Sequence, residues 1–126
     1  MDTMDVDEAP RKLNFILLKQ ELAYGDPTFR TITVPSSCNL SELRKIIHAE
    51  CPTLLQGIDP ASLKAYKASL SPIESKELLQ DLKERKRIAT SKWNTTLLDD
   101  LDLLSDYFTN QPDKRAIHLI VDCTEA

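Results

Sequence analysis

The chain has 126 residues, of which 41% are hydrophobic and 29% are charged, and its formal net charge is −4 at pH 7. This composition is that of a folded globular protein, and the length suits one hydrophobic core better than two. The negative charge opposes binding to phosphate polyanions, so nucleic acid is not an expected partner.

The N-terminal segment is acidic. It carries Asp2, Asp5, Asp7 and Glu8 and no base before Arg11. A secretory signal peptide begins with a positively charged region, so none is visible here. Residues 1–11 also lack periodic apolar side chains, which predicts a disordered acidic tail. No apolar run approaches the roughly 18 residues that a membrane helix needs, so no membrane span is expected.

Two strands are predicted first. Residues 13–19 carry apolar side chains at both parities, as expected of a strand in the middle of a sheet with both faces covered. Gly25-Asp26-Pro27 predicts a turn, because glycine permits positive φ and proline restricts φ. Residues 28–34 alternate, with Ile32 and Val34 on one face, so we expect a half-buried second strand that forms a hairpin with the first.

A helix is predicted after this hairpin. Asn39 and Glu42 have the spacing of a capping box, which satisfies backbone amides at a helix N-terminus. Pro52 is expected to end the helix. The apolar positions recur at spacings of three and four residues and form one stripe, made of Leu40, Leu43, Ile46 and Ile47.

A third strand is predicted at residues 63–68. Ser71 and Pro72 then favour a second helix over about residues 72–89, because proline at the first helical position loses no intrahelical hydrogen bond. Residues 97–108 are apolar and acidic together and predict short helical turns. The side chains expected to point inward from these turns are Leu101, Leu104 and Phe108.

Residues 116–122 predict the last strand, with Ile117, Leu119 and Val121 on one face. The order is therefore strand, strand, helix, strand, helical insertion, strand. This order predicts an α+β fold in which a helix crosses a mixed sheet.

The order of motifs resembles two known families. Ile32-Thr33-Val34 followed by Leu40, Leu43 and Ile47 resembles ubiquitin over about residues 13–50. Over residues 13–123 the chain resembles the N-terminal domain of fungal Crinkler effector proteins. The segments that carry this resemblance are Leu43-Arg44-Lys45, Leu63-Lys64-Ala65-Tyr66, Asp106-Tyr107-Phe108 and Ile117-His118-Leu119-Ile120-Val121. The resemblance implies a ubiquitin-like β-grasp domain at residues 12–124, with a helical insertion at about 69–98.

The Crinkler resemblance also implies a function. Such a domain is non-catalytic, precedes a variable effector domain and acts in secretion, translocation into host cells and protein binding. The implied location is outside the producing cell and in the host cell, including the host nucleus. Oomycete members carry an L-F-L-A-K translocation motif, and its nearest equivalent here is the segment Leu63, Lys64, Ala65, Tyr66, Lys67 and Ala68. Simple strand packing of Leu63 and Ala65 is the alternative explanation.

No catalytic, cofactor or metal site is predicted. His48 and His118 are the only histidines, and no zinc-ligand spacing surrounds them. Cys38, Cys51 and Cys123 form no C-x-x-C motif and are interpreted as small buried hydrophobic residues. The two glycines cannot form a phosphate-binding loop. The alternative enzyme hypothesis is a nuclease that holds Mg²⁺ with its acidic cluster.

Basic side chains are the candidate partner surfaces. The run Lys83, Arg85, Lys86 and Arg87 follows a helix and suits phosphate binding or an import signal. The alternative is that these bases complement the helix dipole and are neutralised by nearby aspartates. Those aspartates are Asp99, Asp100, Asp102 and Asp106.

A second basic group suggests an alternative function, an intracellular β-grasp adaptor. Arg30, Arg44 and Lys45 lie on the predicted second strand and first helix, and such a patch resembles that of Ras-binding domains. Alternatively, Asp99 and Asp102 opposite a basic strand resemble the head-to-tail Phox-and-Bem modules. Both patches imply a protein partner with opposite charge.

Overall fold

The computed structural model describes residues 10–99 and 101–123. The strands are β1 (Arg11–Lys19), β2 (Leu22–Ala23), β3 (Phe29–Val34), β4 (Lys64–Ala68), β5 (Thr95–Leu97) and β6 (Leu119–Asp122). The helices are α2 (Leu40–Glu50), α3 (Pro72–Lys83) and α4 (Leu104–Tyr107), and short 3-10 turns lie at Pro60–Ser62 and Thr90–Lys92. The prediction of an α+β fold is confirmed. Most of the predicted tail lies outside the described residues, but Arg11 is buried in β1.

The strands form one mixed sheet in the order β2-β1-β6-β4-β5, and β3 also pairs with β1. The β1 and β6 strands are parallel, with Phe15 opposite Leu119. The other neighbours are antiparallel, and in the β1–β3 pair Leu13 lies opposite Ile32. The β1 strand therefore lies inside the sheet, as the apolar run at residues 13–19 predicts.

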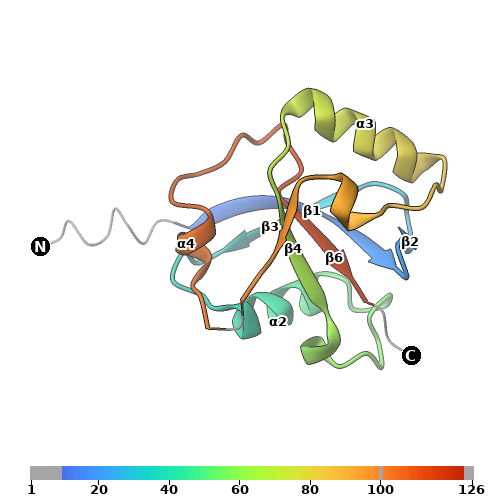
Figure 1. The fold of residues 1–126 in the computed structure, drawn as a ribbon. Coiled ribbons are helices and arrows are strands. Elements are labelled where there is room, and N and C mark those ends of the chain that lie inside the picture. The colour runs from blue at the N-terminus through green and yellow to red at the C-terminus, as the bar shows by residue number, and fades with distance from the viewer. Residues whose placement is uncertain (1–9, 100, 124–126) are drawn as a thin grey trace, which may run out of the picture.

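The sheet has an apolar layer on each face. Figure 1 shows α2 on one side of the sheet and α3 on the other. Leu13, Phe15 and Leu17 of β1 belong to the core cluster that also contains the buried side chains of α2. Ile16 and Leu18 belong to a second cluster with buried side chains of α3. The two parities of the β1 pattern thus serve two different cores.

The N-terminus of α2 is capped as predicted. The Asn39 side chain accepts a hydrogen bond from the Glu42 amide at 2.9 Å, and the Glu42 carboxylate accepts one from the Asn39 amide at 3.0 Å. Such a cap contributes about 1 kcal/mol. Leu40, Leu43 and Ile47 are buried and fix which face of α2 contacts the sheet.

The first turn lies earlier than predicted. The chain reverses at Gln20 and Glu21, which have φ values of 54° and 68°, and β2 then pairs with the end of β1. Neither residue is glycine, so the sequence carries no turn signal there. Gly25 has a φ of 81° and forms a second bend before β3. The predicted hairpin of β1 with β3 is present, and the residues between them contain this extra pair of bends.

The second helix begins where predicted but ends earlier. Ser71 and Glu74 form a capping box, and Pro72 is the first residue of α3. The helix stops at Lys83 instead of 89, because Arg85 adopts a φ of 56° and the chain turns back. This reversal brings Ile88 into the second core cluster, where its amide donates to the Glu21 carbonyl at 2.7 Å.

The predicted helical insertion also contains a strand. Residues 95–97 form β5, which pairs with β4 so that Ala68 lies opposite Thr95 and Tyr66 opposite Leu97. Trp93, just before β5, is buried in the second core cluster. The insertion therefore covers one face of the sheet with α3 and extends its edge with β5.

Two orientations near the C-terminus differ from the prediction. Leu104 and Phe108 are buried as expected, but Leu101 is exposed. Leu119 and Val121 lie in the first core cluster, whereas Ile117 lies in the second. Regular alternation starts only with β6 at Leu119, so Ile117 does not share the face of the two later residues.

Candidate partner surfaces and their supports

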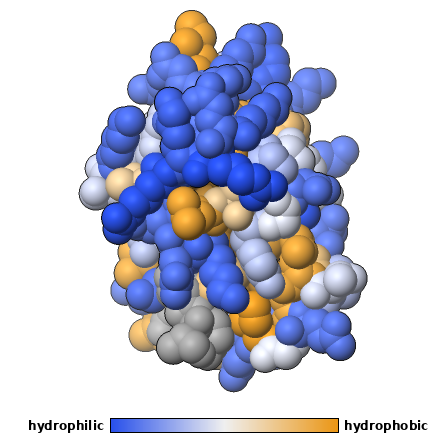
Figure 2. Space-filling model, turned by 90° about the vertical axis from the view of Figure 1, so that its right-hand side faces the viewer, coloured by the Kyte–Doolittle hydropathy of each residue, from blue (hydrophilic) through white to orange (hydrophobic). Residues whose placement is uncertain are grey.

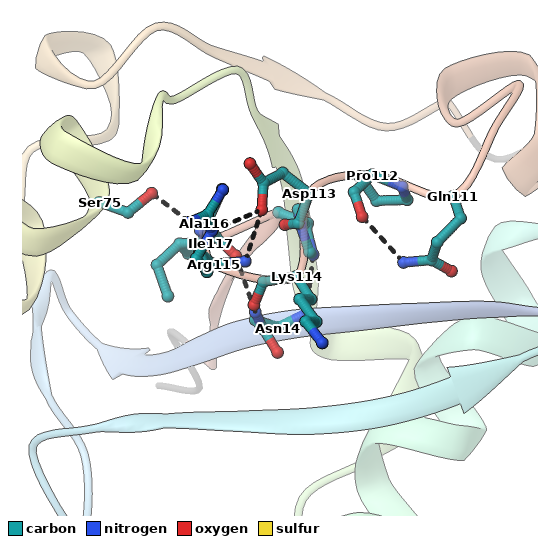
Figure 3. Close-up of polar contacts among 10 residues, drawn as sticks. Asn14, Ser75, Gln111, Pro112, Asp113, Lys114, Arg115, Ala116 and Ile117 are labelled. Atoms are coloured by element: carbon teal, nitrogen blue, oxygen red, sulfur yellow. Dashed lines mark hydrogen bonds and ion pairs between the residues drawn. The ribbon is translucent and has the colours of Figure 1, made fainter.

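The segment that leads into β6 is anchored by a buried polar network. The Asn14 side-chain amide donates to the Lys114 carbonyl at 2.9 Å and to the Ala116 carbonyl at 2.8 Å (Figure 3). The hydroxyl of Ser75 on α3 accepts a hydrogen bond from the Ile117 amide at 2.8 Å. The network therefore connects β1, α3 and the segment before β6 through directed hydrogen bonds.

His118 completes this network with both ring nitrogens. Its Nδ1 accepts a hydrogen bond from the backbone amide of Asn14 at 2.9 Å. Its Nε2 lies 2.6 Å from the backbone carbonyl oxygen of Asp113. The Nδ1 atom must be unprotonated to accept, so the ring is neutral with its proton on Nε2. Burial lowers the pKa of His118, and the neighbouring Asp113 partly opposes this shift. The geometry gives His118 a structural role in holding the segment.

Asp122 at the end of β6 holds the Gln20–Glu21 turn. One carboxylate oxygen accepts a hydrogen bond from the backbone amide of Gln20 at 3.1 Å. The other accepts one from the backbone amide of Glu21 at 3.2 Å. The side chain is buried, and burial raises the pKa of the Asp122 carboxyl although the two amides lower it. This interaction satisfies two backbone donors in a turn that has no glycine.

The basic run begins at Lys83, the last residue of α3, and continues beyond the helix. Lys83, Arg85, Lys86 and Arg87 are all exposed and lie within one short stretch of the chain. Figure 2 shows that the right-hand face of the molecule is mainly hydrophilic, with small separate hydrophobic patches. We call these four residues the basic end of the insertion.

Two members of the basic end have acidic partners. The Lys86 ammonium lies 3.0 Å from Glu84 and 3.8 Å from Asp81, and Arg87 pairs with Glu21. The hydrogen bond and charge of Glu84 raise the pKa of Lys86. Lys83 has no ion pair among the described residues. Acidic side chains of the described residues therefore neutralise only part of the basic end.

The predicted neutralising aspartates lie elsewhere. Asp99 accepts the Leu101 amide, Asp102 accepts the Tyr107 hydroxyl at 2.8 Å, and Asp106 accepts the Leu103 amide at 2.9 Å. These three carboxylates bond within their own loop and α4, and none of them forms an ion pair with the basic run among the described residues. Asp100, the fourth of them, lies outside the described residues.

Arg30, Arg44 and Lys45 are not gathered into one patch. Arg30 lies on β3, whereas the Arg44 side chain donates to the Leu63 carbonyl at 2.9 Å, just before β4. The β1 and β6 strands lie between β3 and β4, which corresponds to about 14 Å across a sheet. Lys45 is exposed beside Arg44. The structure thus brings Arg44 and Lys45 together and leaves Arg30 apart.

The candidate translocation segment forms β4 and the residue before it. Leu63, Ala65 and Ala68 are buried, Tyr66 and Lys67 are half-buried, and Lys64 is exposed. Since β4 pairs with both β5 and β6, its backbone is also occupied. In the folded domain, Lys64 is the one residue of this segment that is exposed.

One hollow on the surface is not predicted by any sequence pattern. It has a volume of about 380 Å³ and lies between the end of β4 and residues 107–113, with His118 in its wall. Lys67 donates to the Tyr107 carbonyl at 2.8 Å and lies 5.3 Å from the Phe108 ring centroid. These residues are distant in the sequence, so no local motif indicates the hollow.

Metal-binding and membrane-spanning features are absent from the described residues. There, no three His, Cys, Asp or Glu side chains are grouped so that they could hold a metal ion. None of the helices formed by residues 10–99 and 101–123 has the length and apolar character to cross a membrane. Cys38, Cys51 and Cys123 are unpaired and buried. Burial raises the pKa of Cys38 and of Cys123 to about 11, and it also raises the pKa of Cys51.

Comparison with known proteins gives one family. The model of the Crinkler effector protein N-terminal domain matches residues 13–122, which run from within β1 to the end of β6. No curated protein matches the chain.

Proposed function

Because the chain belongs to the Crinkler effector protein N-terminal domain family, we propose that it is the non-catalytic N-terminal domain of a secreted effector of the fungal type. In this role it acts in secretion, in translocation into host cells and in protein binding, and it precedes a downstream effector domain. The observation that carries the proposal is the family match over residues 13–122, which includes both core layers.

We also propose that residues 12–124 form one domain of the ubiquitin-like β-grasp type. The support is the arrangement of the strands, in which β1 lies between β3 and the parallel strand β6 while α2 crosses one face of the sheet. The insertion at about 69–98 then adds α3 to the opposite face. A single cooperative unfolding transition, seen alike by far-ultraviolet and near-ultraviolet circular dichroism, is expected for one domain.

We propose the basic end of the insertion as the principal partner surface of this domain. These four residues are exposed at the C-terminal end of α3 and directly after it, and α3 itself packs on the sheet through buried side chains. A basic surface of this kind suits an acidic protein partner or an import receptor in the host cell. The second basic pair, Arg44 and Lys45, is smaller, and Arg44 is already bonded to Leu63.

Delivery is tested with the full-length effector. Its producing strain carries one fragment of a split fluorescent protein on the effector, and the recipient cells express the other fragment. We expect recipient cells to fluoresce with the native N-terminal domain and to stay dark when this domain is deleted. Equal fluorescence with and without the domain would show that delivery does not depend on it.

Charge-reversal variants locate the responsible surface. We expect Lys83→Glu combined with Arg85→Glu to reduce delivery or nuclear accumulation, since neither residue forms an ion pair with another side chain among the described residues. Lys64→Gln tests the candidate translocation segment at its exposed position and places no second negative charge beside Asp122, which lies opposite Lys64. The matched control is Lys76→Glu, an exposed base on α3 outside the basic end. Full delivery by the double variant would contradict the assignment of this surface.

A further inference from the structure

Leu101 faces solvent where the sequence pattern predicts burial. Its side chain is 89% exposed, and Leu97 and Leu103 are 57% and 42% exposed. Isolated exposed leucines are common on soluble proteins. Three within one short segment are a local concentration of exposed apolar side chains, and such a concentration is typical of a place where another molecule binds. We call residues 97–99 and 101–103 the leucine loop.

The leucine loop is held in place by hydrogen bonds. The Tyr107 hydroxyl accepts the Asp99 amide at 2.9 Å and donates to the Asp102 carboxylate at 2.8 Å. Leu103 donates its amide to Asp106 at 2.9 Å. The following residue, Leu104, is buried and donates its amide to the Cys38 carbonyl at 2.8 Å. A loop that is ordered before binding loses less conformational entropy when a partner covers it.

Carboxylates accompany these leucines. Asp99 and Asp106 are exposed and Asp102 is half-buried, while the whole segment 97–108 contains no lysine or arginine. At protein interfaces an apolar centre is commonly bordered by charged groups that match charges of opposite sign on the partner. The partner of this loop should therefore present an apolar surface with basic residues around it.

We propose that the leucine loop is a docking surface for a protein with an apolar helix face bordered by lysine or arginine, and that Leu101 contacts this face. This surface is distinct from the basic end of the insertion, which suits an acidic partner. Docking at the leucine loop requires no step of delivery into host cells. The same surface would serve equally to bind a partner in the producing cell.

The probe is a synthetic amphipathic helical peptide of leucine and lysine, with one leucine stripe bordered by lysines. Binding is followed by the amide chemical shifts of the isotopically labelled domain. We expect the shift changes to concentrate on the described residues of segment 97–108 and to weaken as salt is added. Leu101→Ser should weaken binding by about 10-fold or more, since burial of a leucine side chain contributes that much affinity.

Ile73→Ser is the matched control, because Ile73 on α3 is 71% exposed and lies beside acidic residues of that helix. This variant should bind the peptide with native affinity, and a leucine–glutamate peptide of the same pattern should bind more weakly than the leucine–lysine peptide. The proposal is overturned if the shifts concentrate on α3, if no shift occurs in segment 97–108, or if Ile73→Ser loses as much affinity as Leu101→Ser. Concentration-dependent shifts of the leucine loop without peptide would also overturn it, since a second copy of the chain would then cover the loop.

Discussion

Asn14 and His118 form two hydrogen bonds with each other, although Asn14 lies on β1 and His118 lies in the segment before β6. The backbone amide of Asn14 donates to His118 Nδ1 at 2.9 Å, and the backbone amide of His118 donates to the backbone carbonyl of Asn14 at 2.9 Å. The imidazole thus takes the place of a backbone acceptor beside β1. This geometry requires the neutral ring, so it makes the stability of the domain sensitive to pH.

The free energy of unfolding should decrease as the pH falls below about 6.5, the usual pKa of histidine in an unfolded chain. The folded pKa of His118 is lowered by burial, so the unfolded state binds the proton first. The contribution of neutral His118 to the free energy of unfolding is complete above this pH. It decreases as the pH falls from about 6.5 to the lower pKa of the folded state, by at most about 1.4 kcal/mol per pH unit. Denaturant unfolding across this range measures the slope. His118→Gln should remove this part of the slope and His48→Gln should keep it.

Asp122→Ala should destabilise the domain by about 1–3 kcal/mol, because the amides of Gln20 and Glu21 lose their acceptor. Asp122→Asn keeps one acceptor oxygen and removes a buried charge, so its cost should be smaller. Chemical denaturation at neutral pH distinguishes the two variants. An Ala variant as stable as the native protein would mean that water replaces the carboxylate without cost.

Ser75→Ala should cost about 1–3 kcal/mol, although it removes a single oxygen atom. The Ser75 hydroxyl accepts the buried amide of Ile117, and alanine leaves that donor without a partner. Ser69→Ala, at an exposed position, is the control and should leave the unfolding free energy unchanged. Hydrogen exchange of the Ile117 amide gives a local readout, and unchanged protection in Ser75→Ala would contradict the assignment.

Leu101→Ser and Leu104→Ala should differ strongly in thermal stability. Leu101 is exposed and its replacement should change little, whereas Leu104 is buried and its truncation should cost about 2–5 kcal/mol. Thermal melting monitored by circular dichroism measures both. Similar melting temperatures for the two variants would show that the two leucines are not oriented as described.

The three thiols should react slowly in the folded domain at pH 8. Cys38, Cys51 and Cys123 are buried, and burial raises the pKa of Cys38 and Cys123 to about 11, so little thiolate forms. A colorimetric disulfide reagent should label them rapidly only after denaturant is added. Rapid labelling of the native protein would indicate local opening near one of the cysteines.

The parts of the fold that the sequence predicts well depend on local signals. Both capping boxes, Asn39 with Glu42 and Ser71 with Glu74, lie at the predicted helix starts, since cap residues act within one helical turn. The two-sided apolar pattern of β1 likewise predicts its interior place, because each parity faces its own core.

The parts that the sequence does not predict depend on distant partners. The Gln20–Glu21 turn has no glycine and is held by Asp122, about a hundred residues later in the chain. Lysine and arginine favour helix, so residues 83–87 on their own would extend α3. The helix ends at Lys83 because burial of Ile88 in the second core cluster requires the chain to turn back. The exposure of the basic end agrees with its sequence, but the pairing of Arg87 with Glu21 has no local signature.

The parallel contact of β1 and β6 also determines how the domain resists force. These are the first and last strands, and they lie side by side in the same direction. A pull applied before β1 and after β6 therefore loads their hydrogen bonds in shear, all at once, instead of opening them one by one. Forced unfolding is controlled by the unfolding rate. A machine that threads this chain through a narrow pore would meet its main mechanical barrier at this pair of strands.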